Sequence, residues 1–189
     1  MAQGMDSQVL MTTMMGVAEQ VLSKMAGVSP TEQPKANESD IVEFMGRMKV
    51  MNIADFNAPV YIASVNFYLN QADLEKHKAK GAMVIHVDVE SASKLYRGLG
   101  FKVPDDEDDM SMLGATGELG NLIGDAFKNE LAGMGHVNLV MSAPRYFRNS
   151  IQEGVEYSPD QKKKYEFNFF YWKKRVLTIE VSMAAIPQK

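Results

Sequence analysis

The sequence predicts an α+β domain. Apolar residues recur at helical spacing near the N-terminus and again over 117–133, whereas β-branched and aromatic residues are concentrated elsewhere, as in 59–69. The two kinds of segment are interspersed without a regular βαβ order, and the C-terminal stretch predicts a hairpin. The 189 residues are enough for one domain with a sizeable core, so we assign 1–189 to a single domain.

The first half of the chain contains a predicted helix and two predicted strands. The helix is expected over 6–27, where apolar residues follow a helical period. The polar segment 28–40 contains two prolines and is expected to be a loop or linker, and 41–56 is ambiguous but compatible with a short helix. Strands are predicted over 59–69 and over 81–89, because the latter alternates apolar and polar side chains.

The second half of the chain contains a short helix, a longer helix and three strands. Pro144 is expected to end the first of these strands, and a turn at Lys173 and Lys174 joins the other two. The predicted segments are, in order, a helix over 90–101, an acidic loop over 103–112, a helix over 117–133, a strand over 136–144, a connection over 146–164 and a hairpin over 164–184.

The composition excludes several classes of function. A net charge of −4 is unfavourable for binding nucleic acid, which requires a basic face, but it is compatible with a protein partner. With no cysteine there is no disulfide framework, thiolate nucleophile or cysteine metal site. The N-terminal segment lacks the pattern of a signal peptide, and no stretch approaches the roughly 18 apolar residues of a membrane span. We therefore expect a soluble, cytoplasmic protein.

The other polar clusters of the sequence do not indicate a catalytic or metal site. The three histidines share no metal-ligand spacing with one another or with acids, so structural roles are expected for them. The acidic run 105–109 lacks the spacing of a calcium loop and predicts a solvated segment. Lysines 162–164 are expected to protect the adjacent aromatic strand from aggregation. No phosphate-binding glycine motif is present.

The helix predicted over 117–133 has one apolar and one polar side. Gly120 and Gly124 lie between these sides, and each costs about 1 kcal/mol relative to alanine in a helix. Close approach of another backbone would explain both glycines. The apolar side contains Leu119, Leu122, Ile123, Ala126 and Phe127, and the polar side contains Glu118, Asn121, Asp125, Lys128 and Asn129. A solvated polar face, with Glu118 favoured near a helix N-terminus, is the simplest interpretation of the helix alone.

The spacing beyond this helix favours a functional interpretation. Glu118 and Asn121 are separated by two residues, and Pro144 follows Asn121 after twenty-two more. This pattern resembles the motif of the CheC/CheX/FliY family of chemotaxis phosphatases, and the similarity extends over most of the chain with one copy of the motif, as in CheX. The resemblance implies a CheC-like fold, with a mixed or antiparallel sheet and long helices packed on one face.

The resemblance also implies an activity and a partner. Proteins of this type remove the phosphoryl group from the aspartyl-phosphate of a CheY-like response regulator. By this resemblance Asn121 positions the attacking water and Glu118 pairs with a lysine of the regulator. We expect Asp125 and Lys128, on the same polar side of the helix, to contact the partner. The Mg²⁺ ion would belong to the regulator, so no cofactor of this chain is expected, and a homodimer is expected as in CheX.

Two departures from the family pattern leave other interpretations open. Gly114 stands where the family has Asp or Ser, and the segment 28–57 is longer and less recognisable than the family requires. A non-catalytic adaptor or flagellar-switch-type interaction module is therefore the main alternative. An unrelated α+β domain, in which Glu118 and Asn121 only face water, is the third.

Overall fold

The computed structural model describes residues 6–25, 28–50, 59–104 and 108–189. Its centre is a seven-stranded antiparallel sheet with the order β1-β9-β10-β5-β4-β6, and β7 also pairs with β4. The strands are β1 (Lys35–Asp40), β4 (Val60–Tyr68), β5 (Gly81–Asp88), β6 (Val140–Met141), β7 (Arg145–Arg148), β9 (Lys163–Tyr171) and β10 (Lys174–Met183). The predicted α+β class is confirmed.

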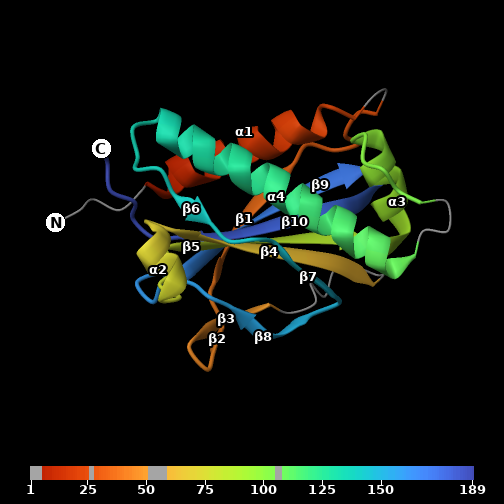
Figure 1. The fold of residues 1–189 in the computed structure, drawn as a ribbon. Coiled ribbons are helices and arrows are strands. Elements are labelled where there is room, and N and C mark those ends of the chain that lie inside the picture. The colour runs from red at the N-terminus through yellow and green to blue at the C-terminus, as the bar shows by residue number, and fades with distance from the viewer. Residues whose placement is uncertain (1–5, 26–27, 51–58, 105–107) are drawn as a thin grey trace.

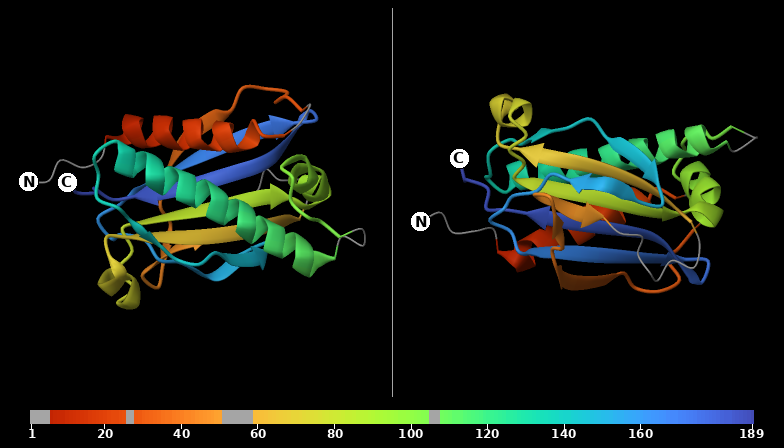
Figure 2. Two further views of the ribbon diagram at one scale, coloured as in Figure 1. Left: turned by 45° about the horizontal axis from the view of Figure 1, so that its top comes forward. Right: turned by 90° about the horizontal axis from the view of Figure 1, so that it is seen from below.

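Two long helices, α1 (Ser7–Leu22) and α4 (Asp109–Gly133), lie side by side on one face of this sheet, as Figure 1 and the left view of Figure 2 show. The main core lies between the helices and the sheet. It forms because alternate residues of each strand face the helices, as Met83, Ile85 and Val87 do in β5. Phe127 of α4 meets Phe67 of β4 edge to face, with ring centroids 5.7 Å apart.

A second, smaller sheet covers the opposite face of β4 and β5 (Figure 2, right view). It has the order β2-β3-β8, made of β2 (Glu43–Phe44), β3 (Arg47–Val50) and β8 (Ile151–Val155). Ile62 and Val84, which point away from the helices, pack there against Met48 and Val155. This second apolar layer explains why β4 and β5 are buried on both faces.

The two short helices lie at the ends of the central strands. Helix α2 (Gln71–Glu75) follows β4, with the Asn70 side chain as its N-cap, and α3 (Val89–Gly98) follows β5 directly. The Ser91 hydroxyl donates to the Asp88 carboxylate at 2.6 Å, which secures the junction between β5 and α3. The predicted strands over 59–69 and 81–89 and the predicted helix over 90–101 are thus confirmed.

The loop predicted over 28–40 is confirmed for 28–34, but the strand and hairpin that follow were not predicted. Within 28–40, β1 pairs antiparallel with β9, although its polar side chains are almost all exposed. Backbone pairing at a sheet edge needs no apolar alternation, so the sequence carried no strand signal there. The segment 41–56, which was ambiguous but compatible with a short helix, contains instead the β2–β3 hairpin, whose turn residues Met45 and Gly46 have φ of 51° and 76°. Residues 51–56 lie outside the described part.

Three further predictions need correction. The acidic loop expected over 103–112 ends early, because α4 begins at Asp109. The Asp108 side chain caps this helix by accepting a hydrogen bond from the Ser111 amide at 3.0 Å. Residues 105–107 lie outside the described part. The strand expected over 136–144 is only β6, and the connection 146–164 contains most of β7, all of β8 and the start of β9. The C-terminal hairpin is confirmed, but its turn is at Trp172 and Lys173, one residue before the predicted Lys173 and Lys174.

Candidate functional site

Glu118 and Asn121 are exposed and lie one turn apart on the outer face of α4. Because α4 begins at Asp109 rather than near residue 117, Glu118 lies about two and a half turns inside the helix. The macrodipole acts mainly on the first turn, so the helix N-terminus does not explain an acid at this position. The two side chains predicted to act together are brought together on one rigid element.

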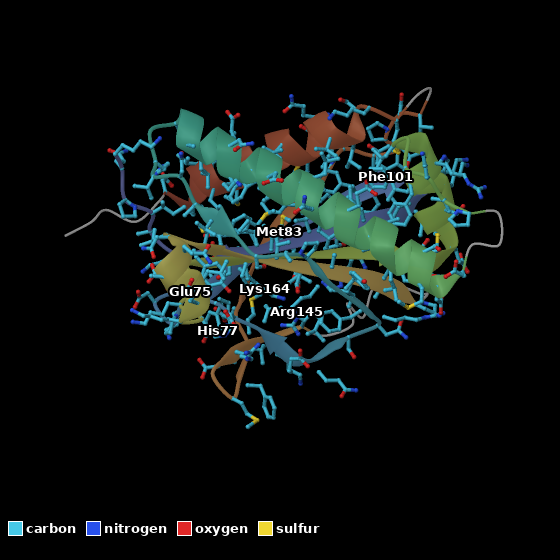
Figure 3. The ribbon with its side chains drawn as sticks, viewed as in Figure 1. Glu75, His77, Met83, Phe101, Arg145 and Lys164 are labelled. Carbon is cyan, nitrogen blue, oxygen red and sulfur yellow. The ribbon has the colours of Figure 1, made fainter. Side chains whose placement is uncertain are left out.

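The glycines of α4 allow the helix to lie close to the sheet. A Cβ atom on Gly120 would lie 3.2 Å from the Cβ of Ala63 in β4. One on Gly124 would lie 2.6 Å from the Sδ of Met141 in β6, and Met83 lies under the helix in the same region (Figure 3). The expected close approach is thus present, but the neighbours are side chains of the sheet rather than another backbone. This packing holds the outer face of α4 in a fixed position.

The segment from β6 to β7 runs along α4 in the opposite direction, as Figure 1 shows. Met141 lies beside Gly124, Pro144 and Tyr146 lie beside Gly117, and Arg148 pairs with Asp109 at the start of the helix. Pro144, the proline of the sequence motif, therefore lies next to the residue that precedes Glu118. The spacing of the motif is explained by this return of the chain along the helix.

Among the described residues, several charged groups near the pair have partners within the chain. The Asn121 amide nitrogen lies 3.5 Å from Asp125 Oδ2, and Asp125 Oδ1 lies 3.0 Å from Lys128 Nζ. Arg145, below α4 in Figure 3, pairs with Glu153 of β8. Within the described residues, Glu118 makes neither a hydrogen bond nor an ion pair. Glu118 is therefore available to a cation from outside.

Asp125 and Lys128, which were expected to contact a partner, are only partly exposed and pair with each other. Their role as partner contacts stays a prediction. Gly114 lies one turn before Glu118 and is exposed, and a Cβ atom there would meet nothing within 4 Å. A side chain at this position would therefore extend into open space.

Sequence reasoning missed one residue of this region. Tyr146 follows the motif proline by two residues, keeps 44% of its surface exposed, and lies against Gly117. Its position after Pro144 was the available signal, but that stretch was expected to be an irregular connection. Its place beside α4 depends on the pairing of β7 with β4, which no local pattern indicates.

A separate charged cluster is buried on the sheet face away from the helices. Glu180 accepts from Lys164 and lies 3.2 Å from the Nε2 atom of His86. Burial alone would raise the pKa of Glu180, but the hydrogen bond and charge of His86, together with Lys164, lower it to about 2. The cluster is enclosed, so it is assigned to stability rather than to the site. Among the described residues, no three His, Asp or Glu side chains converge to hold a metal ion.

Comparison with solved structures identifies the fold. A CheC-like superfamily protein from Shewanella sp. PV-4 superimposes with a TM-score of 0.61 over 94% of this chain and 97% of that chain, at 19% identity. The fold is CheC-like. The chemotaxis protein CheX from Desulfovibrio desulfuricans gives a TM-score of 0.56 at 16% identity, covering 92% of this chain and 98% of its own.

A chain of the CheX–CheY–BeF₃–Mg²⁺ complex from Borrelia burgdorferi also gives a TM-score of 0.56 at 16% identity, over 95% of this chain and 98% of that chain. The fold implied by the sequence motif is therefore confirmed, with its antiparallel sheet and long helices on one face. No family model and no curated protein matches the sequence. Within the described chain, no helix combines the length and apolar character that crossing a membrane requires.

Proposed function

We propose that this CheC-like protein is a response-regulator phosphatase that hydrolyses the aspartyl-phosphate of a CheY-like receiver domain. The observation that carries the proposal is the exposed pair of Glu118 and Asn121, one turn apart on a helix that is packed tightly onto the sheet. The likeness to a chain from a CheX–CheY–BeF₃–Mg²⁺ complex supports a receiver domain as the partner. Chemotaxis is the pathway that the fold relatives favour.

Asn121 has the chemistry required to direct water at an acyl phosphate. Hydrolysis joins the oxygen of water to phosphorus and breaks the bond to the aspartate oxygen, so that a free carboxylate and inorganic phosphate leave. A carboxamide can accept from the water and donate to a phosphoryl oxygen, and it adds no negative charge that would repel the phosphoryl group. Positioning and electrostatics supply most of the catalysis in phosphoryl transfer.

The contacts of Asn121 suit this role. Its Nδ2 atom lies 3.5 Å from Asp125 Oδ2, which favours a side-chain orientation that leaves the oxygen free to accept from water. The α-helix holds the backbone of Asn121 more firmly than a loop would. Insertion into the active site of the receiver then requires only that the two surfaces dock.

Glu118 is the anchor of the proposed complex. The nearby Asp125 is paired with Lys128, and Asp109 at the start of the helix is paired with Arg148. Glu118 has no such partner among the described residues. A lysine of the receiver would pair with it and place Asn121 one turn further along the helix. Asp125 and Lys128 would meet the partner at the edge of the same surface. The Mg²⁺ ion needed for the reaction would be held by the receiver.

The proposal is tested by following phosphate loss from phosphorylated receiver domains of the host with Mg²⁺ present. We expect the protein to shorten the half-life of the phosphoryl group, and Glu118→Gln and Asn121→Ala each to reduce this effect at least tenfold. Glu130→Gln and Asn129→Ala are matched controls, because both residues are exposed on the same helix. Acceleration that is unchanged by Asn121→Ala would exclude the mechanism.

A non-catalytic adaptor is the second candidate, because Gly114 replaces the Asp or Ser of the family and leaves the helix surface open beside Glu118. This alternative predicts that the receiver binds while the half-life of its phosphoryl group stays the same. The phosphate-loss assay therefore separates the two functions.

A further inference from the structure

We propose that Met110 and Tyr146 form a pair of contacts, here called the flanking pair, that holds the receiver domain against Glu118 and Asn121. The inference rests on the proposed function, because it names further residues of the surface that binds the same partner. It concerns affinity and not the chemical step. The two residues come from different elements, α4 and β7, and neither belongs to the sequence motif.

Met110 lies on the same stripe of α4 as the motif residues. At about 100° per residue, positions 110, 114, 118 and 121 fall within about 80° of one another around the helix axis. Met110 keeps 66% of its surface exposed, although a large apolar side chain is usually buried in a soluble protein. It therefore extends the surface around Glu118 toward the N-terminus of the helix.

Tyr146 borders the same stripe from the side of β7. A Cβ atom on Gly117 would lie only 3.0 Å from Tyr146 Cδ1, so the ring edge lies directly over the helix backbone next to Glu118. The ion pair of Arg148 with Asp109, and the 2.7 Å hydrogen bond from the Tyr61 hydroxyl to Asp109, hold β4, β7 and the start of α4 together. The ring is thus placed firmly while 44% of its surface stays exposed.

The region between these two side chains is suited to a partner. Gly114 lies between Met110 and Glu118 on the helix, and the space above it is open, so a partner can approach the backbone there. Tyrosine is enriched at the residues that dominate binding energy, and methionine adapts its shape to irregular surfaces. Met110 and Tyr146 are the exposed large apolar side chains of α4 and β7 among the described residues, so they offer apolar area that binding can bury.

Exposed apolar residues elsewhere provide matched controls. Phe44 and Met45 are 57% and 86% exposed on the β2–β3 hairpin, which belongs to the small sheet on the other face of the central sheet. In Figure 1 this hairpin lies on the opposite side of the sheet from α4. Met45→Ala therefore matches Met110→Ala, and Phe44→Ala matches Tyr146→Ala, with similar loss of apolar surface away from the site.

The test measures the affinity of the protein for the receiver domain loaded with Mg²⁺ and BeF₃⁻, which stands in for the phosphoryl group, and the kinetics of phosphate release from the phosphorylated receiver. We expect Met110→Ala and Tyr146→Ala each to raise Kd about tenfold. KM should rise by a similar factor while kcat stays unchanged, because neither side chain touches the reacting atoms. Tyr146→Phe should keep most of the affinity, and the two hairpin variants should bind like the unaltered protein.

Equal affinity of the unaltered protein, Met110→Ala and Tyr146→Ala would overturn the inference and leave the phosphatase proposal intact. A receiver that binds, is not dephosphorylated, and binds both variants more weakly would support the flanking pair and overturn the phosphatase proposal. A receiver that does not bind the unaltered protein would overturn both. Should Tyr146→Ala fail to fold, Met110→Ala decides the question, since its side chain is mostly exposed.

Discussion

Two glycines of α4 should respond in opposite ways when each is replaced by alanine. One substitution should raise the free energy of unfolding and the other should lower it. Gly114→Ala places a methyl group in open space, so only the helix propensity changes, and the protein should be stabilised by about 1 kcal/mol. Gly124→Ala gains the same propensity, but its methyl group would lie 2.6 Å from Met141 Sδ and 3.3 Å from Val65 Cγ2. Overpacking of this kind costs about 1–3 kcal/mol, so a net destabilisation of about 1 kcal/mol is expected.

The assay is urea unfolding followed by far-UV circular dichroism, with the free energy of unfolding extrapolated to water. Gly16→Ala in α1 is a matched control, because Gly16 is also exposed with nothing within 4 Å of a Cβ atom, and it should stabilise the protein as Gly114→Ala does. Equal stabilisation by Gly114→Ala and Gly124→Ala would refute the close packing of α4 on the sheet. That packing is the basis for treating the outer face of α4 as rigid.

Two further predictions concern stability and assembly. The lowered pKa of Glu180 contributes stability that is complete above its ordinary value of 4.5 and is lost as the pH falls toward about 2. The free energy of unfolding should therefore fall by about 3 kcal/mol over this range. Glu180→Gln should abolish that part of the pH dependence, whereas the exposed control Glu38→Gln should keep it. The expected homodimer predicts a mass by light scattering of twice the 21.1 kDa of the chain, and a mass of one chain would contradict it.

Strong local periodicity was sufficient to predict the long helices and the central strands of the large sheet. The alternation over 81–89 and the apolar stripe of 117–133 gave the central strand β5 and most of α4. The start of α4 was missed because the acidic residues before Met110 suggest a solvated loop, although Asp108 serves as the N-cap. An aspartate such as Asp108, standing just before the apolar residues that begin at Met110, was a usable helix-start signal.

The missed strands depend on tertiary pairing. In β1 almost every side chain is exposed, so only its backbone pairing with β9 makes it a strand. Strands β7 and β8 are short, and β7 runs beside α4 only because it pairs with β4. The site residues divide in the same way between local pattern and tertiary pairing. Glu118 and Asn121 could be predicted from their spacing along one helix, whereas Tyr146 is brought to them by the path of the chain between β6 and β7.

The central claim is that Asn121 directs water onto the aspartyl-phosphate after Glu118 has helped the receiver to dock. The most direct measurement is the first-order rate of phosphate loss when a trace of phosphorylated receiver is saturated with excess protein. The rate with Asn121→Ala should fall to the spontaneous rate of the receiver although the complex still forms, and the rate with Asn129→Ala should stay unchanged. A saturated rate with Asn121→Ala equal to that of the unaltered protein would contradict the claim.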